Sequence, residues 1–186
     1  MNLVARAKAI LTTPRQEWEV IDSEPLDVGK LLTGYVLPLA AIGPIASAIG
    51  WTLFGFGGLF HMSMGTAITH AIVAFIMAII GVFVLAWIIN ALAPTFGATQ
   101  SMPQAIKLAA YSSTAAWVAG IFGLFPALAI LAAIGGIYSL YLCYLGLPVL
   151  MKNPAEKTTT YFIVIIVAAI IIYVVIGTIT ARMMYF

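Results

Sequence analysis

Residues 13–50, TPRQEWEVIDSEPLDVGKLLTGYVLPLAAIGPIASAIG, decide the fold of this chain. The stretch holds five of the six acidic residues and then passes without a gap into the first long apolar segment. A short basic segment precedes it, and almost no charge follows it. This order predicts a charged surface helix joined directly to a helix that enters a membrane.

The composition of the whole chain supports this interpretation. Hydrophobic residues make up 63% of it and charged residues only 8%, and the mean hydropathy is +1.13. Soluble domains carry about 25% charged residues, so this composition cannot build a water-facing surface and indicates an integral membrane protein. The few Lys and Arg residues are too scattered for a nucleic-acid surface, so we expect no nucleic-acid partner.

The apolar residues fall into separate segments that are each long enough to cross a bilayer. Residues 108–151 carry no charge, and as one helix they would be about 66 Å long, twice the hydrocarbon core. They must therefore fold back, and the glycines and proline of residues 120–126 are suited to a turn. We predict an all-α membrane protein in which residues 31–186 form a five-transmembrane-helix bundle. The expected spans are 31–54, 66–93, 104–121, 126–150 and 158–180.

Residues 1–30 are expected to form cytoplasmic interfacial helices. In residues 1–11, Leu3, Ala7 and Ile10 share one helical face, while Arg6 and Lys8 are expected to face the lipid headgroups. This is the pattern of a short amphipathic helix lying on a membrane.

A second helix is predicted to begin at Thr13. Pro14 suits the first helical position, and Gln16 suits a capping box with the Thr13 hydroxyl. The helix should end by Glu24, because Pro25 disfavours helical geometry in the residue before it.

One face of this second helix is our candidate interaction surface. Trp18 and Ile21 lie three residues apart and can dock on lipid or on the bundle. If the protein contacts a cytoplasmic partner, we expect the contact here. The residues of this surface are Pro14, Glu17, Trp18, Ile21 and Glu24.

The distribution of cations predicts the orientation. With five spans and a cytoplasmic N-terminus, only Arg182 lies on the outer side. Cations concentrate on the cytoplasmic side of membrane proteins, so we expect an external C-terminus. The inner cations are Arg6, Lys8, Arg15, Lys30, Lys107, Lys152 and Lys157.

The sequence offers little for chemistry. The interior of the predicted membrane region holds no Asp, Glu, Lys or Arg, which argues against a pump or a proton-driven transporter. No acid–base pair and no phosphate-binding loop is visible, so we expect no catalytic residue, no cofactor and no metal. A Cu(I) site at His61 and His70, with Met62 and Met64, is the weaker alternative.

A stripe of tyrosines in the fourth span is the main partly polar feature of the membrane region. Tyr138, Tyr141 and Tyr144 recur at every third residue and either pack inside the bundle or line a groove. Together with the proline-broken first span, they define a candidate intramembrane groove. Its residues are Tyr35, Pro38, Tyr138, Tyr141 and Tyr144.

Two stretches of the sequence carry a resemblance to a known family. In the first, Pro14-x-x-Glu17-Trp18-x-x-Ile21 is followed by Glu24-Pro25 and then by Gly34-Tyr35-Val36-Leu37-Pro38-Leu39. The second is Tyr141-Leu142-x-Tyr144-Leu145-Gly146-Leu147-Pro148. In these motifs the chain resembles bacterial members of the Yip family, which is named for the Ypt-interacting protein domain.

The resemblance implies a membrane protein without enzymatic activity. Eukaryotic members of the family bind Rab-type GTPases and one another, and they shape or sort membranes. Their long N-terminal domain and its Asp-Leu-Tyr-Gly-Pro type motif have no counterpart here, which leaves GTPase binding doubtful. We therefore expect a multi-pass protein of the bacterial cytoplasmic (inner) membrane. It would be a scaffold that contacts the lipid bilayer and itself or another membrane protein, and the alternative is a transporter or channel for a small molecule, an ion or a lipid.

Overall fold

The structure is a computed structural model that describes residues 2–55 and 61–184, together with the side chains of these residues except for 173 and 175–184. Within these ranges every regular element is a helix. The first six are α1 (Leu3–Thr12), α2 (Pro14–Ser23), α3 (Val28–Leu31), the π-helix η1 (Leu32–Val36), α4 (Leu37–Ala40) and α5 (Ile42–Leu53). They are followed by α6 (Met64–Leu92), η2 (Ala93–Phe96), α7 (Met102–Ser112), α8 (Thr114–Ala119), η3 (Gly120–Leu124), η4 (Pro126–Leu128), α9 (Ala129–Met151), η5 (Ala155–Lys157) and α10 (Thr158–Met184).

Five helical stretches in the described part are long and apolar enough to cross a membrane. This confirms the predicted all-α fold with five transmembrane helices. The external position of the C-terminus stays a prediction, and the last two residues lie outside the described ranges. The five stretches are Val28–Leu53, Met64–Phe96, Met102–Leu124, Pro126–Met151 and Ala155–Ile172.

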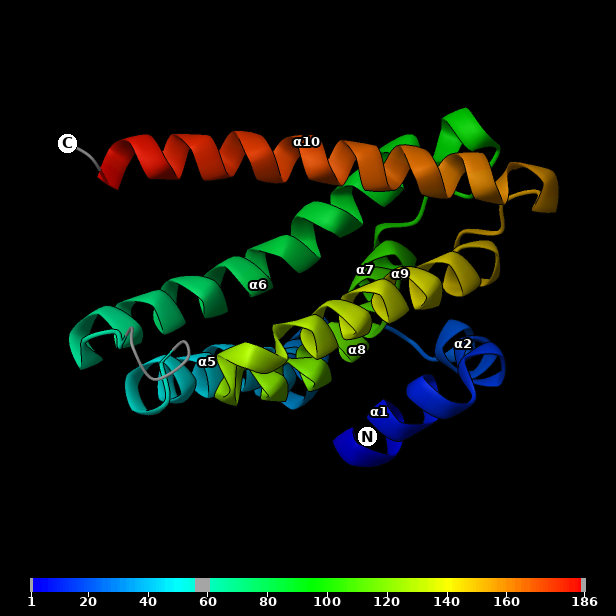
Figure 1. Cartoon of the computed structure of the whole chain (residues 1–186). Helices are drawn as coiled ribbons and strands as arrows, with labels where there is room; N and C mark the ends of the chain where they lie inside the picture. Colours follow the sequence, from blue (N-terminus) through cyan, green and yellow to red (C-terminus); the bar gives the residue numbers. More distant parts are fainter. Residues whose placement is uncertain (1, 56–60, 185–186) are drawn as a thin grey trace.

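The two ends of the helix bundle are formed by different connections (Figure 1). The α1–α2 hairpin, the link from α6 to α7 and the link from α9 to α10 lie towards the right of the view. The end of α5, the turn before α9 and the end of α10 lie towards the left. The chain therefore crosses the bundle in alternating directions, as five spans require.

The first membrane stretch is broken into short pieces. Proline has no backbone N–H to donate within a helix, and Pro38 and Pro44 lie in α4 and α5. The helix widens to a π-helix at η1, just before Pro38, and is interrupted at Ala41, just before Pro44. The breaks that the sequence predicts at these two prolines are present.

The fold-back within the uncharged run lies at η3 and η4, as predicted. It packs against α5 through glycines, and the backbones come very close. A Cβ atom added to Gly120 would lie 2.6 Å from the Gly43 Cα, and one added to Gly50 would lie 2.2 Å from the Gly123 carbonyl oxygen. No side chain fits at these contacts, so glycine is required where α5 meets the fold-back.

The tightly packed core lies at the hairpin end of the bundle. Side chains there are fully buried, among them Trp18, Ile21, Leu108, Leu147 and Leu150. Elsewhere α6, α9 and α10 expose large apolar side chains along their length, including Ile72, Ile137 and Ile170. A membrane-spanning bundle places such side chains against lipid.

The start of α2 differs from our expectation. Pro14 is the first residue of the helix, as predicted, but the Thr13 side chain makes no capping hydrogen bond to α2. Its hydroxyl instead donates to the Ala9 carbonyl oxygen at 3.1 Å. The capping-box prediction is wrong, because Thr13 also ends α1 and its hydroxyl bonds to that helix.

Candidate functional site

The candidate site is the place where the α1–α2 hairpin docks on the bundle. The apolar face of α2 is turned inward, and both Trp18 and Ile21 are 0% exposed. The Trp18 indole lies against α9 at Gly146, where an added Cβ atom would come within 2.6 Å of the indole Cε2 and also within 2.6 Å of the Leu108 Cδ1. Gly146 therefore forms a notch that receives the indole.

A chain of aromatic rings extends from this notch into the membrane region. The Trp18 ring meets Tyr111 of α7 edge-on, with 6.5 Å between the centroids. The Tyr111 ring in turn lies 4.8 Å from the Tyr35 ring of η1. The Tyr35 hydroxyl is hydrogen-bonded to the Thr114 hydroxyl at 2.7 Å. Through these rings α2 is packed against the first and third spans.

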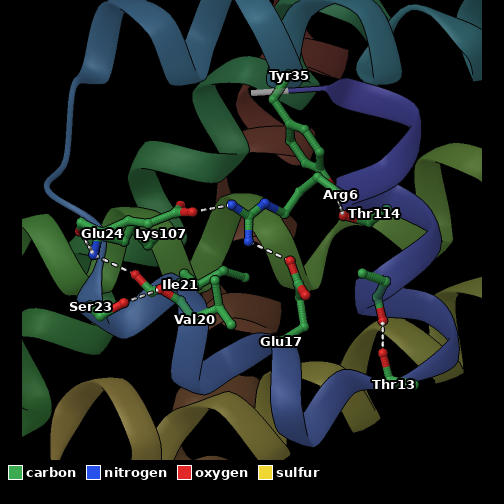
Figure 2. A network of polar contacts seen from close by, with 11 residues as sticks. Arg6, Thr13, Glu17, Val20, Ile21, Ser23, Glu24, Tyr35, Lys107 and Thr114 are labelled. Atoms are coloured by element: carbon green, nitrogen blue, oxygen red, sulfur yellow. Dashed lines mark hydrogen bonds and ion pairs between the residues drawn. The ribbon is translucent and has the colours of Figure 1, made fainter.

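Arg6 joins the two helices of the hairpin. Its guanidinium group is ion-paired with the carboxylates of both Glu17 and Glu24 (Figure 2), and it lies over the Tyr111 ring at 5.8 Å from the centroid. Burial alone would lower the pKa of Arg6, but the Glu24 and Glu17 carboxylates outweigh it and raise that pKa above its ordinary value. The Arg6 side chain is only 10% exposed, so the expectation that it faces the headgroups is wrong.

Lys107 of α7 contacts the C-terminal end of α2. Its side chain is buried, although it lies in a membrane-spanning stretch. The ammonium group donates to the carbonyl oxygen of Ile21 at 2.7 Å and to that of Glu24 (Figure 2). The last carbonyls of a helix lack intrahelical partners and carry partial negative charge. Lys107 therefore acts as a cap for the C-terminus of α2, supplied by α7.

Asp22 ties the same end of α2 to two more elements. One carboxylate oxygen is ion-paired with the Lys152 ammonium at 2.5 Å, and the other accepts from the Gln104 side chain at 2.9 Å. Lys152 follows the end of α9 and has a left-handed backbone, with φ of 53°. The hairpin is thus fixed to α7 and α9 by charged groups as well as by its apolar face.

The family model of the Yip1 domain matches residues 8–177 of the chain. The chain belongs to the Yip1 family. No match was found among curated proteins or among solved structures. The Yip resemblance predicted from the sequence is confirmed, and the protein is a multi-pass membrane protein whose apolar helices contact lipid.

In this Yip1-family protein, the two stretches that carry the resemblance meet in space. Trp18 of the first stretch lies in the notch at Gly146 of the second. Glu17 and Glu24 of the first stretch hold Arg6, and Tyr35 extends the aromatic chain. In the sequence these motifs lie on separate elements, and no local pattern indicates that they meet.

The five residues predicted as an interaction surface fall into different environments. Trp18 and Ile21 are buried in the bundle, and Glu17 and Glu24 are engaged with Arg6. Pro14 is partly exposed. These side chains therefore hold the helix in place, and the face turned outward consists of Arg15, Gln16, Glu19 and Val20. That α2 binds a partner stays a prediction.

The residues of the predicted tyrosine groove also take separate roles. The Tyr138 hydroxyl donates to the Leu11 carbonyl oxygen at 2.8 Å, and the Tyr144 hydroxyl is hydrogen-bonded to the Thr159 hydroxyl at 3.3 Å. Tyr35 bonds to Thr114, as described above. These three tyrosines join neighbouring helices by hydrogen bonds. Such contacts favour the interpretation that they pack inside the bundle over the interpretation that they line a groove.

Tyr141 is the exception among these tyrosines, because it is 44% exposed. Its ring lies 5.6 Å from that of Tyr138. Together with the start of α2 it lines a hollow of 250 Å³ on the surface. One residue from each of the two predicted sites, Pro14 and Tyr141, therefore contributes to the same hollow. Its lining residues are Thr13, Pro14, Arg15, Gln16 and Tyr141.

Proposed function

We propose that this protein is a non-enzymatic scaffold of the bacterial cytoplasmic membrane, and that it binds its partner with the outer face of α2. The observation that carries the proposal is the contrast between the two faces of that helix. The inner face is held by the buried side chains of Trp18 and Ile21. Lys107 also holds the C-terminal end of the helix by donating to its carbonyl oxygens. The outer face is exposed, so a partner meets a surface that is already ordered.

The distribution of charge supports a cytoplasmic position for this face. The α1–α2 hairpin and the link from α9 to α10 hold five of the eight Lys and Arg residues, and both lie at one end of the bundle (Figure 1). At the other end the only cation in the sequence is Arg182, in the last turn of α10. Cations favour the cytoplasmic side of a membrane, so residues 1–30 and the hairpin end face the cytoplasm in our proposal.

The surface offers both an apolar and a polar contact. Val20 is 47% exposed and Tyr141 is 44% exposed, and the hollow of 250 Å³ is bordered by Arg15 and Gln16. Exposed aromatic and arginine side chains are typical of binding hot spots. A second copy of this chain or another membrane protein is the partner that we propose.

Site-specific photo-crosslinking in cells tests this function. A photoreactive amino acid at Gln16 or Val20 should give one discrete protein adduct, the same from both positions. The matched control is Ile137 of α9, which is 67% exposed on a membrane-spanning stretch and should give lipid adducts. If Gln16 and Val20 also capture lipid alone, the scaffold proposal is wrong.

A transporter or channel is the second candidate, because a cavity of 410 Å³ lies between α5, α6 and α8. Its wall includes Pro44, at the broken part of the first span, and His70, with small residues such as Ala74 between them. Broken helices that line a cavity are a common basis for transport sites. Flux in proteoliposomes that is lost on Ala74→Phe would support this candidate, and the absence of any flux would remove it.

A further inference from the structure

A second cavity, of 490 Å³, lies between the hairpin, the start of the first span and α7. It lies apart from the hollow at the start of α2, since the two have no lining residue in common. Its wall combines charged groups with the backbone of the first span. The lining residues that matter here are Arg6, Glu24, Asp27, Lys30, Gly34 and Lys107.

The charges in this cavity are balanced. Three cations and two carboxylates line it, and Glu17, which is ion-paired with Arg6, brings the count to three of each. The lining is therefore neutral as a whole but strongly dipolar. Such a wall matches a ligand that carries both a positive and a negative group, and it would repel neither.

The outer charges are available to a ligand, whereas the inner cations, Arg6 and Lys107, are engaged within the protein. Asp27 and Lys30 form an ion pair at 3.3 Å, with side chains that are 52% and 89% exposed. Exposed pairs of this kind contribute little stability, so a ligand can replace their mutual contact. The pKa of Asp27 is lowered, first by the hydrogen bond from the Lys30 backbone and then by the Lys30 side chain, so Asp27 is ionised at neutral pH. Glu24 lies farther in and is ion-paired with Arg6, but its side chain is 40% exposed, and a carboxylate has acceptor sites left for a ligand.

The position of the cavity suits a lipid headgroup. Its charged residues lie where the first membrane stretch begins, at Val28, and Gly34 lies about one and a half turns farther along the helix. Nothing lies within 4 Å of a Cβ atom added to Gly34. The wall is therefore open beside the membrane-spanning segment, where a phospholipid can enter from the side.

We propose that this cavity binds the headgroup of an amine-bearing zwitterionic phospholipid. The primary ammonium group donates hydrogen bonds to the carboxylates of Glu24 and Asp27, and the phosphate accepts from Lys30. A trimethylammonium headgroup has no N–H to donate. An anionic headgroup without an amine places negative charge against both carboxylates. The cavity therefore discriminates among headgroups by charge and by hydrogen bonding.

The test uses the full-length protein in nanodiscs of phosphatidylcholine alone, or of phosphatidylcholine mixed with phosphatidylethanolamine or with phosphatidylglycerol. Native mass spectrometry measures the retained lipid, and the thermal unfolding midpoint measures its effect on stability. We expect phosphatidylethanolamine to be retained at least about tenfold better than either of the other lipids, as one or two charge-assisted hydrogen bonds imply. It should also raise the midpoint.

Two variants and one control variant locate the effect. Gly34→Leu places a side chain in open space and should abolish the preference for phosphatidylethanolamine without unfolding the protein. Gly136→Leu on α9 is the matched control, because nothing lies within 4 Å of its added Cβ either, and it should keep the preference. Lys30→Gln, at an exposed position, should weaken retention several-fold.

Any one of three retention results would overturn the proposal. These are equal retention of the three lipids, an unchanged preference in Gly34→Leu, and equal loss of the preference in Gly34→Leu and Gly136→Leu. Soluble phosphoethanolamine shares the same charged groups and is tested in phosphatidylcholine nanodiscs. If it raises the midpoint as much as the lipid does, the occupant is a soluble zwitterion and the lipid assignment is wrong.

Discussion

At the scale of single residues, the docking of the hairpin depends on a pair matched in size, Trp18 and Gly146. The indole occupies the space that a side chain at position 146 would need. Among the residues that the structure describes, the Trp18 Nε1–H finds no acceptor. The indole therefore contributes through its shape and apolar area rather than through a hydrogen bond.

Gly146→Ala should loosen the hairpin, because the added methyl group overlaps Trp18 and Leu108. Overpacking of this kind costs about 1–3 kcal/mol. Hydrogen–deuterium exchange of the α1–α2 peptides in nanodiscs should become faster, while exchange in the rest of the bundle stays unchanged. The control Gly136→Ala, which has open space around its Cβ, should leave α1–α2 exchange as it is. Restoration of slow exchange by adding Trp18→Phe, which has a smaller ring, would identify the clash as the cause.

Lys107→Met should have a comparable effect for a different reason. The substitution keeps the apolar stem of the side chain but leaves the Ile21 and Glu24 carbonyls without their donor. We expect a loss of about 1.5–3 kcal/mol, the range for hydrogen bonds to charged groups. Chemical unfolding in detergent measures this loss. The control Lys8→Met changes an exposed lysine of α1, and a similar loss there would contradict the capping role of Lys107.

The burial of Arg6 and Lys107 could not be predicted from the sequence. The sequence pattern places Arg6 at the headgroups and Lys107 on the cytoplasmic side, since a local pattern shows only that each lies beside apolar residues. Their burial depends on carboxylates and carbonyls of α2, and for Lys107 these lie more than 80 residues away in the chain. The only local signal was that Lys107 is the single charge of a long membrane stretch.

At the scale of elements, the hairpin behaves as one unit because Arg6 of α1 is shared between Glu17, inside α2, and Glu24, at its C-terminal end. Arg6→Gln should separate the two helices, since Glu17 and Glu24 then face each other without a cation. Breaking a buried ion pair costs about 3–5 kcal/mol, and the partial exposure of Glu24 reduces this to about 2–4 kcal/mol. Faster hydrogen exchange in both helices would be the result expected. A change confined to α1 would contradict the shared role.

Most elements could be predicted, because their signals are local. The length of each apolar run gives the spans, Pro25 ends α2, and the glycines and Pro126 give the fold-back. The capping box failed where α1 and α2 adjoin so closely that they share Thr13. The tyrosine groove was proposed from spacing alone, and spacing cannot tell that Tyr138 and Tyr144 bond to two different helices.

At the scale of the whole molecule, the concentration of charge at one end predicts the orientation in the membrane. A reporter fused after Phe186 should be active only outside the cytoplasm, because the chain crosses five times from a cytoplasmic N-terminus. A second reporter in the polar link after α9, near Asn153, should be active only inside. Cytoplasmic activity of the first reporter would contradict the five-span topology.

The central claim is that a docked α2 presents its outer face to a protein partner. Photo-crosslinking from Val20 in cells, compared between the natural sequence and Gly146→Leu, tests it most directly. We predict a discrete protein adduct from Val20 in the natural sequence, which is lost when the larger side chain displaces Trp18 and undocks the hairpin. An adduct that persists unchanged after undocking, or the capture of lipid alone in both proteins, would contradict it.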